Sequence, residues 1–212
     1  MTASFLTTTP TFESIARCLI ARRAVYPRKP PAGWHTAALF FSRVPAARAP
    51  WGLPVKKIAV FADVQNLYYT VRQAYGCHFN YAALWADISK RGEIVEAYAY
   101  AIDRGDSKQQ QFQQILRNLG FIVKLKPYIQ RSDGSAKGDW DVGITIDIMD
   151  SAANVDEVVL ASGDGDFDLL LERIASKHGV ETVAYGVPGL TANSLIRAAS
   201  RYVPIEGNLL LK

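Results

Sequence analysis

The chain has few of the residues that build disulfide frameworks, thiolate metal sites or membrane spans. Of its 212 residues only two are cysteines, Cys18 and Cys77, and neither a CxxC spacing nor a histidine cluster lies beside them. A zinc site or a disulfide framework is therefore not expected. The three histidines, His35, His78 and His178, are isolated, and no chemistry is assigned to them. No apolar run approaches the roughly 18 to 20 residues that cross a membrane, so a soluble protein of the cytoplasm is expected.

Acidic residues are nearly absent from residues 1–54, where Glu13 stands against seven arginines and lysines. This segment carries +6, and because the whole chain carries +4, the remainder carries −2. The pI of about 9.0 therefore describes the segment and gives no ground for nucleic-acid binding by the rest.

The segment 1–54 resembles an organellar transit peptide in composition, because it is rich in Arg, Ser, Thr and Ala. The simpler interpretation is a disordered or non-native extension that precedes a domain at 55–212. In a bacterial gene a GTG codon at Val55 would then be the true start. Peptide mapping that finds residues 1–54 in the native protein would exclude this hypothesis.

Proline is scarce after residue 54, where apolar runs alternate with amphipathic ones. The pattern predicts an α/β domain with a mostly parallel central sheet and helices on both faces, since two of the runs are continuously apolar. Asn80 and Thr191 are expected to cap helices. The predicted strands are 58–62, 94–101, 121–126, 158–161, 182–185 and 202–204, and the predicted helices are 66–74, 81–90, 107–118, 141–152, 167–177 and 191–199.

Carboxylates stand where the two most apolar strands end. Asp63 follows the first strand, with Asn66 three residues on, and Asp164 and Asp166 follow the strand at 158–161. Asp141 opens the helix before that strand. The carboxyl ends of parallel strands share one edge of a sheet, where ligands bind. Grouped carboxylates repel one another unless a cation intervenes, so the pattern favours a site for Mg²⁺ or Mn²⁺.

Three segments, VFADVQN at 60–66, KGDWDV at 137–142 and SGDGDF at 162–167, together resemble the LabA-like branch of the NYN family, which belongs to the PIN-like nucleases. The resemblance covers nearly all of residues 56–206 and implies a Rossmann-like PIN fold with metal-dependent ribonuclease ancestry. By position it implies that Asp63, Asp141, Asp164 and Asp166 hold the metal. Asn66 would orient substrate or a metal-bound water. These five residues are the predicted catalytic set.

Basic side chains precede the helix that Asp141 opens. Lys124, Lys126, Arg131 and Lys137 are predicted phosphate contacts, the alternative being ordinary solvated loop charge. Tyr68, on the first helix, is a predicted stacking partner for a base, the alternative being a place shared between core and surface. Single-stranded RNA is the predicted partner. PIN-like domains often pair, so a homodimer is expected by analogy alone.

The acids also have simpler explanations. Asp63, Asp139 and Asp166 could each be only a helix N-cap, and Asp168 a first-turn acid that favours the helix dipole. Asp147 is six residues into its helix, roughly 240° from the first residue, so it is placed in a supporting position or in solvent.

Other functions fit the residues less well. A haloacid-dehalogenase phosphatase needs a second Asp where Gln65 stands, and a dinucleotide-binding domain needs GxGxxG after the first strand. A calcium loop needs glycine where Leu169 stands. A catalytically silent regulatory or RNA-binding protein on the same fold is the main alternative. The grouped acids favour the enzyme, whose predicted reaction is attack of a metal-activated water on an RNA phosphodiester, leaving 3′-hydroxyl and 5′-phosphate ends as the resemblance implies.

Overall fold

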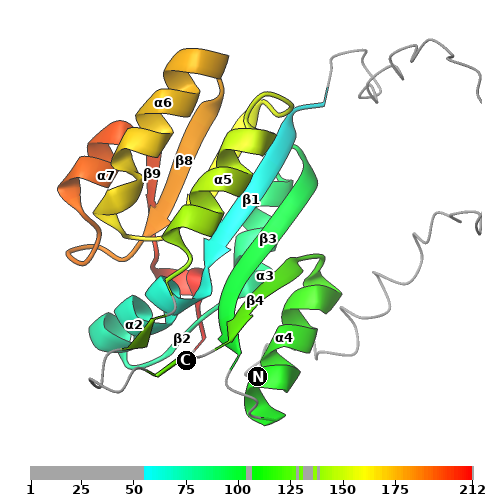
Figure 1. Ribbon diagram of the computed structural model, residues 1–212, viewed down its shortest axis with the longest axis vertical. Coiled ribbons are helices and arrows are strands. Elements are labelled where there is room, and N and C mark those ends of the chain that lie inside the picture. Colours follow the sequence, from blue (N-terminus) through cyan, green and yellow to red (C-terminus); the bar gives the residue numbers. More distant parts are fainter. Residues whose placement is uncertain (1–54, 104–106, 128, 131–135, 138, 212) are drawn as a thin grey trace, which may run out of the picture. The chain divides into compact units, whose positions relative to one another are not determined.

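Six parallel strands form the central sheet, in the order β4-β3-β1-β7-β8-β9 (Figure 1). The computed structural model describes residues 55–103, 107–127, 129–130, 136–137 and 139–211, and the basic segment 1–54 lies outside them. The strands of this sheet are β1 Lys57–Asp63, β3 Glu93–Asp103, β4 Ile122–Pro127, β7 Glu157–Ala161, β8 Glu181–Gly186 and β9 Arg201–Pro204. All six strands predicted from the sequence are confirmed, and their pairing is parallel throughout.

The two continuously apolar strands lie at the centre of the sheet. Residues 58–62 of β1 and 158–161 of β7 are almost fully buried, as expected for strands covered on both faces. β1 pairs with β7 in register, so that Ala62 lies beside Ala161. The residues that follow, Asp63 and Ser162, are thereby brought side by side.

Helices cover both faces of the sheet (Figure 1). They are α2 Val64–Tyr75, α3 Tyr81–Ser89, α4 Ser107–Leu119, α5 Asp141–Ser151, α6 Asp168–His178 and α7 Asn193–Ala198. One half of the core joins α2, α3 and α4 to the sheet, and the other half joins α5, α6 and α7. This arrangement confirms the predicted α/β fold.

The strand order reverses at the centre of the sheet. From β1 the chain proceeds through β3 to β4 on one side, and from β7 through β8 to β9 on the other. This is the doubly wound order, and its ligand site lies beyond the carboxyl ends of the strands where the order reverses. That switch point lies between β1 and β7, where Asp63 and Asp164 stand.

The sequence did not predict the short elements. β2 His78–Phe79 pairs antiparallel with β10 Leu210–Leu211, and β5 Ile129–Gln130 pairs with β6 Ala136–Lys137 inside the expected long loop. The expected cap at Thr191 is wrong, because its hydroxyl donates to the Val187 carbonyl at 2.8 Å and α7 begins later without a side-chain cap. In the part of the chain that the structure describes, no helix is both long and apolar enough to cross a membrane.

Candidate active site

Asp63 ends β1 at the carboxyl edge of the sheet and is buried, with 7% of its surface exposed. Its Oδ1 accepts the backbone N–H of Asn66 at 3.0 Å and so caps α2, while its Oδ2 accepts the hydroxyl of Ser162 at 3.4 Å. Burial raises the pKa of Asp63 to about 6 against the effect of these hydrogen bonds, and the charges of Asp141 and Asp164 add to the rise. Both hydrogen-bond donors are neutral, so the carboxylate charge remains for a cation or a proton to neutralise.

Asn66 ties the first turn of α2 to the residues that follow β7. Its Oδ1 accepts the backbone N–H of Gly163 at 2.9 Å. The N–H of Asp164 donates to Ser162 Oγ at 3.2 Å, which orders the same turn from the other side. Within the described residues the amide nitrogen of Asn66 has no hydrogen-bond acceptor, so it is the group with which Asn66 can orient a ligand.

Asp166 lies in a short 3-10 helix, Gly165–Phe167, between β7 and α6, and Asp164 directly precedes this helix. Asp164 Oδ1 accepts the N–H of Asp166 at 3.1 Å, so Asp164 is the capping residue. The simpler explanation of Asp166 as a helix cap is wrong, because α6 begins with no side-chain cap and Asp166 is exposed. A Cβ at Gly165 would lie 2.9 Å from the Cβ of Ala192, so this turn requires glycine.

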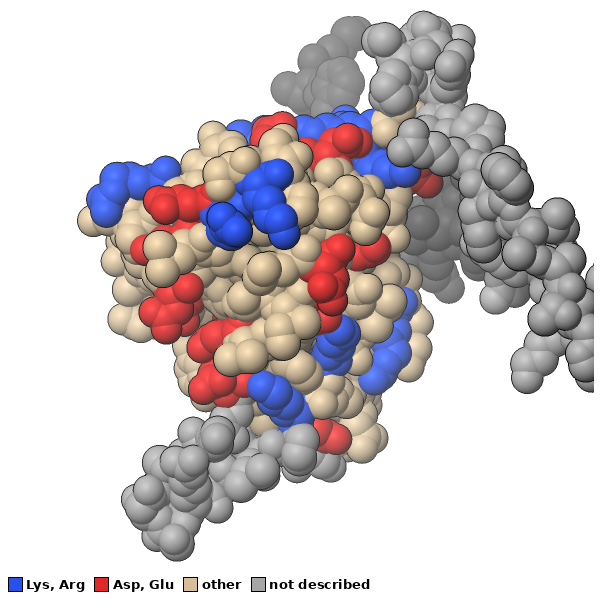
Figure 2. Space-filling view, turned by 45° about the horizontal axis from the view of Figure 1, so that its top comes forward, with Lys and Arg blue, Asp and Glu red and all other residues tan. Residues whose placement is uncertain are grey.

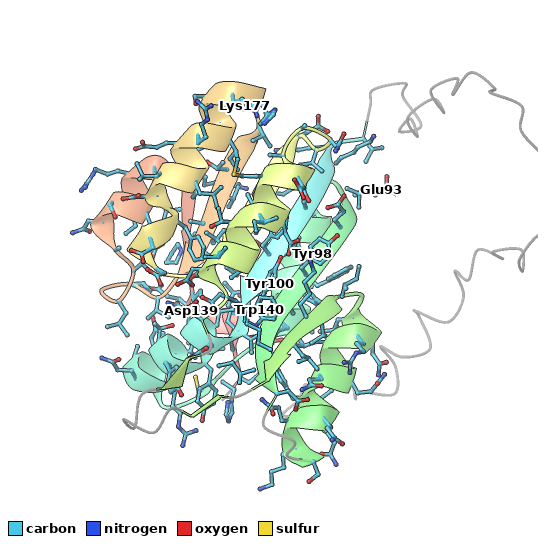
Figure 3. All side chains as sticks on the ribbon, in the orientation of Figure 1. Glu93, Tyr98, Tyr100, Asp139, Trp140 and Lys177 are labelled. Carbon is cyan, nitrogen blue, oxygen red and sulfur yellow. The ribbon has the colours of Figure 1, made fainter. Side chains whose placement is uncertain are left out.

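Asp141 is the first residue of α5 and is half-buried. Trp140 is the N-cap residue, and no side chain caps the helix, which excludes a capping role for Asp139. Trp140 Nε1 donates to the carbonyl of Ala101 at 2.9 Å and anchors the start of α5 on β3. Figure 3 shows Asp139 and Trp140 near the lower, carboxyl end of the strands, with Glu93 toward the opposite end.

The acids share one electrostatic environment. Burial raises the pKa of Asp141, and the charges of Asp164, Asp139 and Asp166 raise it further, while Lys126 opposes the rise. We define the acidic cluster as Asp63, Asp139, Asp141, Asp164 and Asp166. The structure thus brings four predicted metal ligands together with Asp139. Among the described residues, however, no three Asp, Glu, His or Cys side chains converge closely enough to enclose one ion.

The two strand lysines have different surroundings. Lys124 Nζ lies 2.7 and 2.6 Å from the two carboxylate oxygens of Asp147, whose Oδ2 also accepts the hydroxyl of Tyr100 at 2.6 Å. Lys126 Nζ donates to the Asp139 carbonyl at 2.6 Å and lies 4.5 Å from the Trp140 ring centre. Lys126 therefore stands at the acidic cluster with no carboxylate partner among the ion pairs of the described residues, whereas Asp147 supports Lys124.

The remaining predicted contacts have varied outcomes. Arg131 lies outside the described residues, and of Lys137 the structure gives only its place in β6. Tyr68 is 46% exposed on α2 and meets Tyr69 edge to face, with ring centres 5.3 Å apart.

Sequence reasoning assigned no role to Ser162 or Trp140. Ser162 bonds both Asp63 and Asp164, and Trp140 positions Asp141. Their signal lay in the topology: once β1 and β7 are neighbours, the residue that follows β7 must stand beside Asp63.

The amino-acid sequence matches the NYN domain over residues 57–206, which include the acidic cluster. The chain belongs to the NYN domain family. It is 31% identical over 158 residues to the low amplitude and bright protein LabA of Synechococcus elongatus, across 71% of this chain and 84% of LabA. The crystal structure of a protein of unknown function from Vibrio parahaemolyticus is similar, with 54% identity and a TM-score of 0.71, covering 74% of this chain and 97% of that one.

The family assignment confirms the resemblance seen in three short motifs. An NYN domain has a PIN-like, nuclease-type fold, and the six-stranded sheet with its acidic edge conforms to it.

Proposed function

We propose that this NYN domain is a Mg²⁺- or Mn²⁺-dependent ribonuclease that hydrolyses single-stranded RNA. The observation that carries the proposal is the buried carboxylate of Asp63, whose pKa is about 6 because of burial and of two nearby acids, Asp141 and Asp164. A protein keeps like charges together at a cost, and a bound cation is the common reason for doing so.

The donor set fits such a cation. Mg²⁺ takes oxygen ligands, keeps several waters, and is usually held by one or two carboxylates together with substrate phosphates. An open cluster that encloses no ion by itself suits this mode better than a closed cage. One or two of Asp63, Asp141 and Asp164 would hold the ion together with waters and a substrate phosphate, with Asp166 at the exposed rim. The bound ion would supply a Lewis acid that lowers the pKa of a water and offsets charge at the phosphate.

The chain's own residues would position the substrate. Lys126 lies beside the acidic cluster, where its charge opposes the rise in the pKa of Asp141, and it would contact an RNA phosphate. Asn66 is fixed through its amide oxygen, which leaves its NH₂ group to donate to a phosphate oxygen or a water. Ser162 holds Asp63 and Asp164 in relation to one another. The proposed products are 3′-hydroxyl and 5′-phosphate ends.

Cleavage of end-labelled single-stranded RNA by the full chain in Mn²⁺, Mg²⁺ or EDTA tests the proposal. We expect metal-dependent cutting, and a loss of roughly 100-fold or more in Asp164→Asn, the scale on which removing one electrostatic group lowers an enzyme's rate. Asparagine retains the oxygen that caps the 3-10 helix, so this variant should fold.

Asp168→Asn is the matched control. Asp168 is an acid of the same segment that lies outside the acidic cluster, and its replacement should leave cutting within about two-fold, as is usual for a surface change away from a site. Cutting that persists in Asp164→Asn, or that resists EDTA, would contradict the proposal. RNA binding without any cutting would instead favour a catalytically silent RNA-binding protein.

A further inference from the structure

A groove of about 620 Å³ opens between α2, β2 and the start of α4. This volume falls in the range of about 300 to 1,000 Å³ that is typical of sites for small organic groups. The groove is rich in aromatic side chains, and its aromatic members are Tyr68, Tyr69, His78, Phe79, Tyr81 and Phe112. Apart from Tyr68, which the sequence predicts to stack on a base, these side chains have no role assigned above.

The floor of the groove is rigid and its rim is exposed. Tyr81 is buried and meets Phe79 and Phe112 edge to face, with ring centres 4.9 and 5.5 Å apart. On the rim, Tyr68 is 46% exposed and its ring lies 6.3 Å from that of His78, at an angle of 31°. A flat ring that enters the groove would therefore meet an aromatic face at the rim and apolar edges below it.

The groove adjoins the first turn of α2, which Asp63 caps. Val64 and Gln65, which line it, stand in the chain between Asp63 and Asn66. Burial raises the pKa of the Tyr81 hydroxyl, and the Asp63 carboxylate raises it further, so the floor lies within electrostatic reach of the cluster.

We infer that the groove receives an unpaired nucleobase of the RNA, which stacks on Tyr68 beside His78 next to the phosphate held at the acidic cluster. The inference rests on the proposed function, because it takes RNA as the substrate. Stacking on an aromatic ring is the usual means of holding single-stranded bases. The Gln65 amide, which has no hydrogen-bond partner within the described residues, would read a base edge, since glutamine pairs well with adenine.

The groove suits a base better than the backbone. Of the described residues that line it, most are aromatic or aliphatic, and Lys108 is the one lysine or arginine. A phosphate chain needs several cations, whereas a base needs an apolar slot with a few polar groups. The base is also the part of single-stranded RNA that is free to leave the strand, since it has no pairing partner.

Binding of the full chain to a fluorescein-labelled single-stranded RNA, followed by anisotropy in EDTA, tests the inference. The comparison is an abasic oligomer with the same ribose-phosphate backbone and charge. We expect the wild type to bind the base-bearing RNA about 10-fold more tightly than the abasic one, as one stacked base contributes. Tyr68→Ala should remove most of this preference, and Tyr68→Phe should keep it.

Tyr75→Ala is the matched control, because Tyr75 is an exposed tyrosine of the same helix that does not line the groove. It should retain the preference for bases. Equal binding of the two oligomers by the wild type, or an unchanged preference in Tyr68→Ala, would overturn the inference.

The two proposals fail separately. Metal-dependent cutting without a preference for base-bearing RNA would contradict base binding in the groove but would still support the nuclease. A base preference that Tyr68→Ala removes, with no cutting in any metal, would support the groove and contradict the nuclease.

Discussion

Glu157 and Asp63 are buried acids at opposite edges of the same sheet. Glu157 begins β7 at the amino edge and is fully buried, yet Arg91 Nη2 lies 2.7 Å from its Oε1 and Lys56 Nζ 2.7 Å from its Oε2. Figure 2 brings the amino edge forward, and acidic and basic side chains alternate there. Asp63 ends β1 at the carboxyl edge, and the hydrogen bonds that it receives from described residues come from two neutral donors, the Asn66 backbone N–H and the Ser162 hydroxyl.

The pKa values of the two acids move in opposite directions. Burial alone would raise the pKa of Glu157, but the hydrogen bonds from Arg91 and Lys56 outweigh it and hold the pKa below its usual range. Burial raises the pKa of Asp63 to about 6, and the neighbouring acids add to this rise. An acid that serves the fold is paired within the chain, and an acid left without a cation indicates a partner from outside it.

Glu157→Gln should have the largest effect on stability. It would leave Arg91 and Lys56 without their buried partner, and breaking such a pair costs about 3 kcal/mol or more of the free energy of unfolding. Urea denaturation measures this loss. The comparison is Glu181→Gln, which removes the more exposed partner of Lys56 and should cost less than about 1 kcal/mol. Equal losses in the two variants would show that the amino edge does not depend on burial of Glu157.

Asp63→Asn should increase the stability of the folded protein, whereas Glu157→Gln should decrease it. A pKa near 6 in place of the usual 3.8 corresponds to about 3 kcal/mol between the charged and neutral forms of the Asp63 carboxyl group. Relaxation lowers this figure, so we expect a gain of about 1–2 kcal/mol in EDTA at pH 7.5, because asparagine keeps the α2 cap without the charge. Thermal unfolding monitors the gain. A variant less stable than the wild type would mean that the Asp63 charge serves the fold.

For the same reason the Asp63 carboxyl group should make the wild type less stable as the pH rises toward 6 and above. The folded-state pKa of Asp63 is raised, so the folded protein binds the extra proton and the penalty is absent below about pH 4. The free-energy cost of the buried Asp63 charge grows between about pH 4 and 6 and is complete above pH 6. The difference between Asp63→Asn and wild type should follow this course in EDTA. A difference that is constant from pH 4 to 8 would contradict the raised pKa.

A smaller effect is expected from the two lysines of β4, Lys124 and Lys126, which should differ in their contribution to the salt dependence of RNA binding. Lys126→Met should lower the salt dependence of RNA binding by about one unit of slope, since one phosphate contact is lost. Lys124→Met should leave that slope unchanged, because Lys124 is paired with Asp147. Anisotropy titrations between low and moderate salt measure both slopes. A loss of slope in Lys124→Met alone would reverse the assignment.

The fold could be predicted from hydrophobic patterning because the strands and helices of the central domain differ in the spacing of their apolar residues. The apolar runs at 58–62 and 158–161 indicated strands buried on both faces, and both lie at the centre of the sheet. The pairing of His78–Phe79 with Leu210–Leu211 could not be predicted, since two-residue strands joined across the chain have no local pattern.

The candidate site was predictable in its acids and less so in their supports. Asp63 and Asp164 follow apolar strands, which is a local signal. Ser162 and Trp140 act through contacts with distant segments that only the strand order reveals. The groove was missed for the same reason, because Tyr68 of α2 and Phe112 of α4 line one groove only once both helices cover the same face of the sheet.

Direct binding of Mn²⁺ to the full chain, followed by electron paramagnetic resonance, tests the central claim that the carboxyl edge awaits a cation. Wild type, Asp164→Asn and Glu181→Gln would be titrated side by side. The account predicts that wild type and Glu181→Gln bind the ion alike and that Asp164→Asn binds it at least about 10-fold more weakly, since one charged ligand is lost. Equal binding by wild type and Asp164→Asn, or no binding by the wild type, would contradict the account.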